Sequence, residues 1–392
     1  MNTLENETSV DVAIIGAGVA GATAAAALAN RGIMTALIAS HDRHPPEYRA
    51  EKIGEQQMAM FDEAGLGPAA RAVFTPFDGV WVRRFGRIVS RDTKREYGAD
   101  YAILVDALRA GLPDSVRKVV GRVETIETGP DLQTITFADG RMVRARLVVM
   151  ATGLSEAALK KAGLRREIYS RHHSLTAGFD LSRPAGDFVF PSLVWSGDGP
   201  TDHLSYLTLF PIGETMRANL FVYRSPFEDW TKALRDRPDE TLNAMLPEFE
   251  REYGPLAAKG HVAIRPIDLA RTLDTERDGV VVVGDAFLTV CPITGTGMDK
   301  ALNDVVVLAR DHIPGWLSTP GMATDKIASF YADPAKTERD ATAIRISVES
   351  RAVRFDPALR WRLLRLRAML FGRLRYHLPQ SIGAAPHMTS NA

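Results

Sequence analysis

The sequence is poor in cysteine, has no excess of charge of either sign, and contains no long apolar run. Cys291 is the only cysteine, so no disulfide can form within the chain, and a reducing compartment is expected. Lysine and arginine number 48, as do aspartate and glutamate, so the whole chain shows no electrostatic preference for nucleic acid. No stretch approaches the ~20 apolar residues that span a bilayer. The early apolar run Val12 to Ile15 is too short for a signal peptide. We therefore expect a cytoplasmic protein with at most peripheral membrane contact.

One segment departs from this balance of charge. Between Arg351 and Tyr376 there are eight arginines and one acid, Asp356, a net charge of +7. Asp356 is expected to cap a helix over 357–376, with Pro357 in its first position. Leucines recur on one face of this helix, at Leu359, Leu363, Leu366, Leu370 and Leu374. This face either packs on the protein body, contacts an anionic membrane surface, or meets a second copy of the chain.

Secondary-structure patterns indicate two kinds of sheet. A strand over 10–15, an alanine-rich helix over 19–31 and a strand over 34–39 form a βαβ unit. Alternating apolar and aromatic segments between 171 and 224 instead predict an antiparallel sheet with one covered face. Further predicted strands cover 80–90, 119–127, 133–137, 142–150, 261–272 and 280–283. Further predicted helices cover 56–64, 101–110, 227–236, 239–253, 296–310 and 323–349.

A glycine motif links the first strand to the first helix. Gly16, Gly18 and Gly21 form the pattern GxGxxG. The first glycine permits a tight turn, the second lets a pyrophosphate approach the backbone, and the third lets helix and strand pack closely. The start of the helix then offers free N–H groups and a partial positive charge to phosphates. The motif predicts a dinucleotide site, with Ala20 as a further contact.

The acid that normally holds the adenosine ribose at the end of the second strand is missing. Ala39 occupies the aligned position, so Ser40 is the candidate contact, with Asp42 nearby. A serine hydroxyl makes one hydrogen bond where a carboxylate accepts two. Val123, within the strand predicted over 119–127, is a further candidate for the cofactor.

Together these patterns predict an α/β fold. A Rossmann-type nucleotide-binding domain is interleaved with an antiparallel-sheet substrate domain, and C-terminal helices follow. We expect the nucleotide-binding domain to span 1–75, 98–170 and 263–350, and the substrate domain 76–97 and 171–262. The basic C-terminal helix and tail take up 351–392.

A second motif lies more than two hundred residues downstream. Gly284-Asp285-Ala286 ends an apolar strand, and Pro292, Gly295, Gly297 and Met298 follow. In their order and spacing the two motifs resemble the para-hydroxybenzoate hydroxylase-like FAD-dependent monooxygenases, over about residues 1–345. The resemblance implies FAD as the cofactor. It implies that Asp285 contacts the ribityl chain and that the loop from Pro292 through Gly295, Gly297 and Met298 brings a helix start to the flavin ring.

Two departures from the family pattern bear on the reductant. Thr152 replaces the acid of an Asp-Gly motif that contacts FAD and nicotinamide, and Tyr101 stands where an arginine is expected. The resemblance implies NADH or NADPH as the direct reductant, and these changes put that in doubt. A separate flavin reductase is the alternative.

The segment Lys52-Ile53-Gly54-Glu55 is similar to a stretch of flavin-dependent halogenases and geranylgeranyl reductases. The halogenase pattern also requires a Trp-x-Trp-x-Ile-Pro segment, which is missing, and a downstream lysine, but residues 56–93 contain none. Halogenation is therefore disfavoured, and a reductase stays open.

The favoured function is an FAD-dependent monooxygenase that hydroxylates or epoxidises an apolar, aromatic or unsaturated small molecule. The oxygen would come from a C4a-hydroperoxyflavin formed with O₂. No side chain is assigned a catalytic role, and His172-His173 lacks the spacing of a metal site. The alternatives are an FAD-dependent reductase or dehydrogenase of a lipid-like substrate and a flavin-binding protein without turnover. Cys291 is expected to be a buried packing residue. Candidate substrate contacts are Phe190, Trp195, Tyr206, Phe210 and Tyr223.

Overall fold

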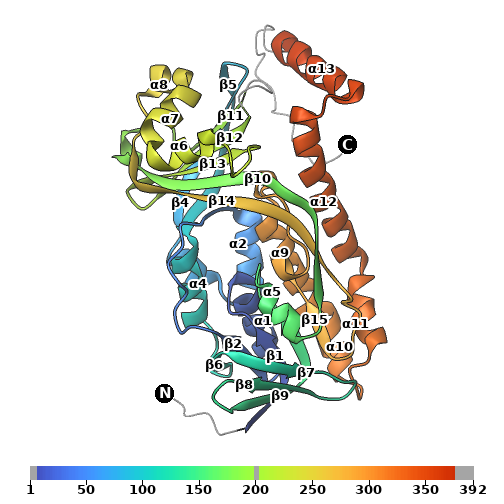
Figure 1. Ribbon diagram of the computed structural model, residues 1–392. Coiled ribbons are helices and arrows are strands. Elements are labelled where there is room, and N and C mark those ends of the chain that lie inside the picture. The colour runs from blue at the N-terminus through green and yellow to red at the C-terminus, as the bar shows by residue number, and fades with distance from the viewer. Residues whose placement is uncertain (1–6, 198–202, 376–392) are drawn as a thin grey trace.

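The computed structural model describes residues 7–197 and 203–375, with side chains up to Arg367, and contains two sheets surrounded by helices (Figure 1). Five strands of the first sheet run parallel in the order β6-β2-β1-β9-β15. They are β1 (Glu7–Ile15), β2 (Thr35–Ala39), β6 (Arg117–Val120), β9 (Met142–Met150) and β15 (Val280–Val282). The hairpin of β7 (Val123–Glu127) and β8 (Gln133–Phe137) extends this sheet antiparallel to the first residues of β9.

The second sheet has eight strands in the order β14-β10-β13-β12-β11-β4-β5-β3. All neighbours pair antiparallel except β11 and β4, which pair parallel. The strands are β3 (Ala50–Gly54), β4 (Thr75–Arg84), β5 (Arg87–Asp100), β10 (Arg165–Pro184), β11 (Leu193–Ser196), β12 (Leu204–Ile212), β13 (Thr215–Val222) and β14 (Ala258–Leu273). The predicted combination of a Rossmann-type sheet with an antiparallel sheet is confirmed.

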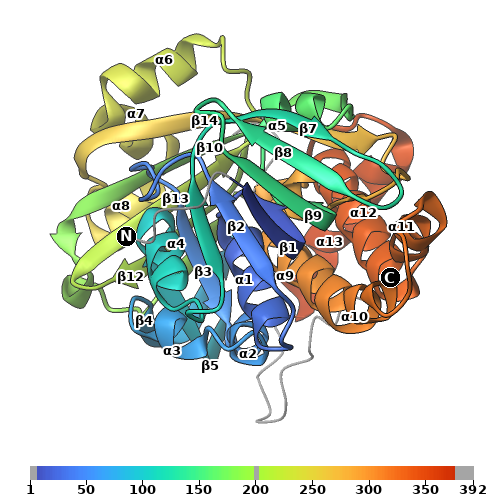
Figure 2. The ribbon, with the colours of Figure 1, turned by 90° about the horizontal axis from the view of Figure 1, so that it is seen from below.

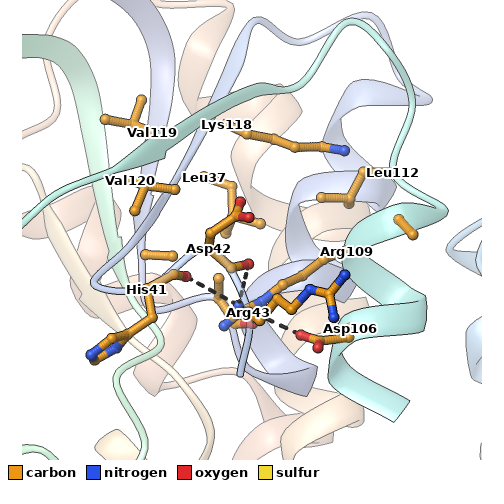
Figure 3. A pocket seen from close by; sticks show the side chains of 13 residues that line it. Leu37, His41, Asp42, Arg43, Asp106, Arg109, Leu112, Lys118, Val119 and Val120 are labelled. Carbon is orange, nitrogen blue, oxygen red and sulfur yellow. Dashed lines mark hydrogen bonds and ion pairs between the residues drawn. The ribbon is translucent and has the colours of Figure 1, made fainter. Parts of the chain in front are cut away.

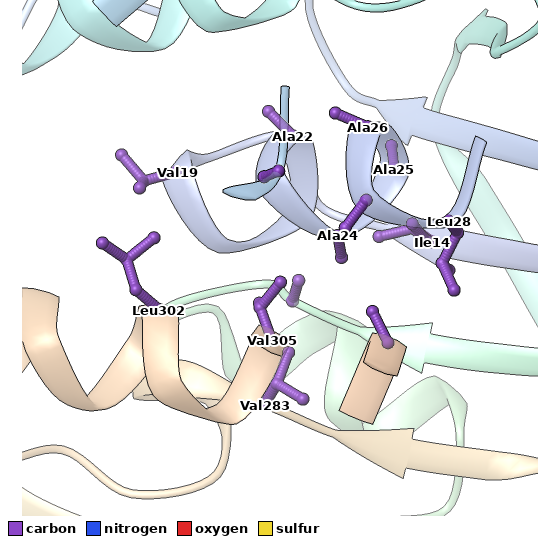
Figure 4. Close-up of a cluster of buried hydrophobic side chains, with 14 of the residues drawn as sticks. Ile14, Val19, Ala22, Ala24, Ala25, Ala26, Leu28, Val283, Leu302 and Val305 are labelled. Atoms are coloured by element: carbon purple, nitrogen blue, oxygen red, sulfur yellow. The ribbon is translucent and has the colours of Figure 1, made fainter. Parts of the chain in front are cut away.

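The parallel strands are covered on one side by helices that pack closely. Figure 2 shows α1 (Val19–Ala29), α4 (Tyr101–Ala110) and α9 (Gly297–Val307) on this side. Figure 4 shows why they approach so closely, because α1 presents alanines where it meets Leu302 and Val305 of α9. The same cluster includes residues of α2 (Glu55–Glu63), α3 (Gly67–Arg71), α10 (Ile313–Leu317) and α11 (Thr324–Tyr331). This contact brings the starts of α1 and α9 together.

The two faces of the eight-stranded sheet differ in chemistry. Its outer face is apolar and packs under α6 (Asp229–Asp236), α7 (Pro238–Met245) and α8 (Pro247–Tyr253). The outward side chains of β10 are Leu175, Ala177, Phe179 and Leu181. Because side chains alternate along a strand, Ser174, Thr176, Gly178 and Asp180 lie on the inner face, toward the parallel strands.

Several predicted elements are divided in the structure. The strand expected over 119–127 breaks at Gly121-Arg122 into β6 and β7, because β6 pairs with β2 and β7 pairs with β8. The helix expected over 239–253 breaks at Pro247, and the one over 323–349 breaks before Pro334, where α12 (Pro334–Phe355) begins. Proline has no N–H to continue a helix, and it favours the first helical turn.

The end of the chain also differs from expectation. The last helix, α13, spans Leu359–Arg375, so Pro357 precedes it, and the Asp356 carboxylate accepts a hydrogen bond from the Ala358 N–H at 2.8 Å. Among the described helices, none is both long and apolar enough to cross a membrane.

Candidate active site

The GxGxxG motif lies between β1 and α1, and its three glycines are required for different reasons. Gly16 has a φ of +107°, and a Cβ there would lie 2.4 Å from the Ala151 carbonyl oxygen. A Cβ on Gly21 would lie 1.8 Å from the Gly16 carbonyl oxygen. Gly18 has an ordinary φ of −74°, and the nearest atom to a Cβ would be Tyr101 Oη at 3.3 Å. Gly16 and Gly21 are therefore needed by the chain itself, whereas Gly18 leaves space in front of the helix start.

Charged and aromatic groups surround that space. Tyr101 begins α4, and the guanidinium of Arg49 lies 4.3 Å from the centroid of its ring. Arg49 Nε also donates to Glu51 Oε1 at 2.6 Å. Burial raises the pKa of Tyr101 and keeps the phenol neutral, although Arg49 opposes this shift. Arg49 could bind the cofactor pyrophosphate. Sequence reasoning missed Arg49, because it stands in a loop outside both motifs.

A cavity of about 480 Å³ lies beyond the carboxyl ends of β2 and β6 (Figure 3). Arg109 of α4 reaches across it, where Nε donates to the Ala17 carbonyl at 2.7 Å and Nη1 donates to the Asp42 carbonyl at 3.2 Å. Open α/β sheets bind ligands at this end of the strands, which suits the adenosine of a dinucleotide. The lining residues are Ala17, Leu37, Ala39, His41, Asp42, Arg43, Asp106, Arg109, Ala110, Leu112, Lys118, Val119 and Val120.

The structure places Ser40 and Val123 outside the lining of this cavity. The Ser40 hydroxyl is hydrogen-bonded to His41 Nδ1 at 2.8 Å. Val123 begins β7, after the break at Gly121, and its carbonyl accepts a hydrogen bond from Lys161. Val119 and Val120 of β6 line the cavity instead.

The second motif turns sharply after β15. Gly284 has a φ of +62° and begins a short 3-10 turn over Gly284–Ala286. Ala20 lies beside it, since a Cβ on Gly284 would be 3.6 Å from the Ala20 Cβ. The half-buried Asp285 follows, and its carbonyl accepts a hydrogen bond from Arg166 Nη2 at 2.9 Å. The first and second motifs therefore meet at this point.

Arg166 connects the second motif to the Thr152-Gly153 segment. Its Nη1 donates to the Gly153 carbonyl at 3.3 Å. Burial lowers the pKa of Arg166, and the charge of Asp285 opposes this shift. Thr152 Oγ1 is buried and, within the described residues, has no hydrogen-bond partner. The expected carboxylate is thus replaced by a hydroxyl beside a guanidinium, and sequence reasoning missed Arg166 because it lies in a strand outside any motif.

The loop expected at the flavin ring is held from two sides. Pro292–Thr294 forms a 3-10 turn, Gly295 is left-handed with a φ of +67°, and α9 begins at Gly297. The first turn of α9 contains Gly297 and the buried Met298. Its backbone N–H groups have no hydrogen-bond acceptor within the helix. Ser347 Oγ of α12 accepts from the Cys291 N–H at 3.0 Å, and Tyr206 Oη donates to the Ile293 carbonyl at 2.6 Å. Cys291 is fully buried, as expected of a packing residue.

A buried cluster of charges lies directly behind Gly284. The Gly284 N–H donates to Asp304 Oδ2 at 2.9 Å, and Lys300 Nζ donates to the same oxygen at 2.8 Å. Lys336 Nζ donates to Asp304 Oδ1 at 3.1 Å and to Asp340 Oδ2 at 2.9 Å. Burial alone would raise the pKa of Asp304, but Lys300 and Lys336 hold it below its ordinary value. The carboxylate is therefore charged and fixes the position of the Gly-Asp turn.

The inner face of the eight-stranded sheet contacts the flavin-ring loop and the start of β3, next to Arg49. Tyr206 contacts the loop at Ile293, and Asn219 Nδ2 donates to the Ala50 carbonyl at 3.4 Å. Between these contacts Thr176 contributes a buried hydroxyl that has no partner within the described residues. Of the candidate aromatic contacts, Tyr206, Phe210 and Tyr223 lie on the inner side, whereas Phe190 and Trp195 pack in the outer core.

A second cavity, of about 460 Å³, lies between β10 and α12. Phe355 in its lining packs against Tyr223, with ring centroids 5.2 Å apart. Tyr223 shares an apolar cluster with Cys291 and Ile293 of the flavin-ring loop. The cavity therefore borders the apolar cluster that contains residues of that loop.

Replacing Asp285 by alanine is expected to weaken FAD binding roughly ten- to a hundredfold. A hydrogen bond to a charged group contributes about 1.5–3 kcal/mol, and Asp285 stands at the carboxyl end of β15, where its carboxylate could accept one from a ribityl hydroxyl. Fluorescence titration of the apoprotein with FAD measures the change. Excess FAD should restore any thermal stability that is lost. An unchanged affinity would remove Asp285 from the cofactor site. Asp278→Ala is the matched control, since Asp278 only accepts bonds from Thr324.

Comparison with known proteins agrees with the two motifs. Residues 9–98 match the FAD binding domain family, and residues 243–351 match the squalene epoxidase family. The chain is 25% identical to 3-demethoxyubiquinol 3-hydroxylase of Escherichia coli, over 79% of this chain and 83% of that protein. It is 23% identical to digeranylgeranylglycerophospholipid reductase of Methanococcus vannielii, over 76% of this chain and 75% of that protein. A solved structure of a probable FAD-dependent monooxygenase from Pseudomonas aeruginosa superposes with a TM-score of 0.72 at 19% identity, covering 93% of this chain and 100% of that one.

These matches confirm the resemblance to the para-hydroxybenzoate hydroxylase-like FAD-dependent monooxygenases, with geranylgeranyl reductases also among the relatives. The chain is an FAD-dependent oxidoreductase, and its relatives include monooxygenases. The residues described above fit this cofactor, because a Cβ at Gly18 would fill the space that its pyrophosphate needs.

Proposed function

We propose that this chain hydroxylates or epoxidises an apolar small molecule that carries an aromatic ring or a double bond. When bound, FAD supplies the redox chemistry and the activation of O₂. The protein groups bind and orient: Gly18 and Arg49 at the pyrophosphate, Asp285 at the ribityl chain, and the start of α9 at the flavin ring. The helix start favours negative charge on the reduced ring.

One observation carries the proposal, namely the chemistry of the face that covers the flavin-ring loop. The uncharged Thr176, Asn219, Tyr206 and Phe221 lie there, and the ion pair of Asp180 with Arg217 lies farther along the same face. Such a cover excludes water from the reacting centre and suits a substrate that needs no proton transfer from a side chain. The same choice is supported by the hydroxylase relative, which acts on a demethoxyubiquinol, and by the match to the squalene epoxidase family.

A second candidate is an FAD-dependent reductase of a lipid-like substrate. The reductase relative supports it, and so does Glu55 at the start of α2, whose carboxylate accepts a hydrogen bond from Tyr97 Oη at 2.6 Å. This hydrogen bond, together with burial, raises the pKa of Tyr97. A reductase also needs a proton donor for its product, a role that a monooxygenase does not require and that this pair would have to fill. A third candidate is a flavin carrier without turnover.

One experiment separates the three candidates. The purified protein, with FAD bound, is mixed without oxygen with NADH or NADPH, and the flavin absorbance is followed. We expect slow or no bleaching, because Thr152 stands where the family pattern has a carboxylate, and Arg166 binds the neighbouring Gly153 carbonyl. A separate flavin reductase would then be the electron source. Bleaching at catalytic rates would instead make the nicotinamide the direct reductant.

The flavin is then reduced with one equivalent of dithionite, if neither nucleotide has bleached it, and the protein is exposed to isotopically labelled O₂ with a panel of a phenol, a quinol and a squalene-like polyene. A product carrying one labelled oxygen atom is expected. A saturated product without label would favour the reductase. Reoxidation of the flavin with every compound unchanged would contradict the monooxygenase proposal and favour the carrier. Beyond the small-molecule substrate and O₂, the partners we propose are the separate flavin reductase and a contact through 357–376.

A further inference from the structure

Over its described side chains, Leu359 to Arg367, the helix α13 (Leu359–Arg375) contacts the rest of the protein with one side. It lies beyond the end of α12 (Figure 1), and Arg365 fastens it there, with Nη1 donating to the Val353 carbonyl at 2.9 Å and Nη2 to the Asp356 carbonyl at 3.0 Å. Trp361, one turn earlier, is half-buried on the same side. These two residues define the side of α13 that faces the body.

The leucines of α13 lie on the opposite side. At roughly 100° per residue, Leu359, Leu363 and Leu366 fall within a narrow stripe about half a turn away from Trp361 and Arg365. Their exposed fractions are 68%, 55% and 48%. Packing of the leucine face on the body is therefore wrong for these three residues. Leu370 and Leu374 lie outside the side chains that the structure describes.

Positive charge flanks the leucine stripe. Arg360 lies on one flank and Arg362 on the other, and both are exposed. The sequence of α13 contains no aspartate or glutamate. The six arginines of α13 are offset by a net charge of −6 on the rest of the neutral chain, so positive charge is concentrated on this helix. A stripe of exposed leucines between arginines is the pattern of a helix that lies in a membrane interface.

The charge also distinguishes between occupants of this face. Two copies of α13 brought together by their leucines would place arginine flanks beside each other, and like charges at close range repel. Lipid phosphates would instead neutralise both flanks while the acyl boundary receives the leucines.

We propose that α13 binds the surface of an anionic membrane, with Leu359, Leu363 and Leu366 inserted and the arginines on lipid headgroups. This inference is independent of the reaction assigned to the flavin. The described helix is held at its base by Arg365, so the membrane contact would fix the whole protein on the bilayer rather than tether it through a loose tail.

The test is co-sedimentation of the full chain with vesicles. Binding is expected to vesicles that contain phosphatidylglycerol and to be much weaker with phosphatidylcholine alone. Each interfacial arginine contributes roughly fivefold to such binding, so Arg360→Gln combined with Arg362→Gln should weaken it roughly twentyfold. Leu363→Glu with Leu366→Glu should abolish it.

Matched controls are Phe227→Glu, at a side chain 83% exposed near α6, and Lys232→Gln with Arg235→Gln on α6 itself. These variants should bind vesicles as the unchanged protein does, and all variants should keep their FAD. A full chain that ignores anionic vesicles overturns the proposal. If that chain instead forms a dimer that Leu363→Glu with Leu366→Glu dissociates, the leucine face is a contact between copies.

Discussion

Gly18→Val is expected to abolish FAD binding while the apoprotein stays folded. The position has an ordinary φ of −74°, which valine adopts without strain, and the nearest atom to a Cβ is the Tyr101 hydroxyl at 3.3 Å. The side chain would instead project into the space that the pyrophosphate needs at the start of α1. Loss of several hydrogen bonds to a charged group, each contributing about 1.5–3 kcal/mol, amounts to more than a hundredfold in affinity.

The measurement is FAD content after purification together with far-UV circular dichroism of the apoprotein. Gly186→Val is the matched control, because no atom lies within 4 Å of a Cβ at that surface position. It should retain FAD. By contrast, Gly16→Val and Gly21→Val should prevent folding, because their Cβ atoms would overlap backbone carbonyls. A Gly18→Val protein that purifies with a full complement of FAD would contradict the assignment of the first motif to the pyrophosphate.

The two motifs and the βαβ unit could be predicted because each depends on a few consecutive residues. A tight turn, a close approach of the backbone or a helix start is encoded locally, and the helix predicted over 101–110 has the same bounds in the structure. The break at Gly121 could not be seen, because it depends on two strands finding different partners. The breaks before Pro247 and Pro334 are encoded locally by the prolines themselves, since proline favours the first turn of a helix.

The cations of the site could not be predicted for a different reason. Arg49, Arg109 and Arg166 come from a loop, the end of a helix and a strand, and only the folded chain brings them to the motifs. An isolated arginine carries no periodicity or spacing that would mark it. The orientation of α13 could not be predicted either. The leucine stripe is visible in the sequence, but the side of the helix that contacts the body is set by Arg365 and Trp361.

The long helix α12 joins these separate features. Lys336 near its start reaches the charges behind Gly284, and Ser347 in its middle accepts from the N–H that leads into the flavin-ring loop. Arg354 near its end donates to the Ser205 carbonyl at the start of β12. One helix therefore positions the Gly-Asp turn, the flavin-ring loop and the start of an interior strand of the eight-stranded sheet. We expect the contact of α12 with the charges behind the Gly-Asp turn to be the most costly of the three to disrupt.

Asp304→Asn is expected to lower the free energy of unfolding of the apoprotein by about 3–5 kcal/mol. Asp304 is fully buried and balances Lys300 and Lys336 together with Asp340, at distances of 2.8–3.3 Å. The amide keeps the shape and can still accept from the Gly284 N–H, but it leaves two buried lysines with one carboxylate. Urea unfolding without FAD measures the loss. Asp311→Asn is the control, because Asp311 forms an exposed pair with Arg310 that should be worth at most about 1 kcal/mol.

A double substitution and a change of pH test whether the loss of charge causes the lower stability of Asp304→Asn. The double variant Asp304→Asn with Lys336→Met keeps one lysine and one aspartate of the cluster. Its loss of unfolding free energy should be about 0.5–3 kcal/mol smaller than the sum of the losses in the two single variants. Because the pKa of Asp304 is below its ordinary value of 3.8 in the folded protein, its charge stabilises the fold above that pH. This contribution is lost as the pH falls through the lowered folded-state pKa, so the gap between the unchanged protein and Asp304→Asn should narrow in acid. A gap that is independent of pH, or additive single changes, would mean that packing rather than charge holds the Gly-Asp turn in place.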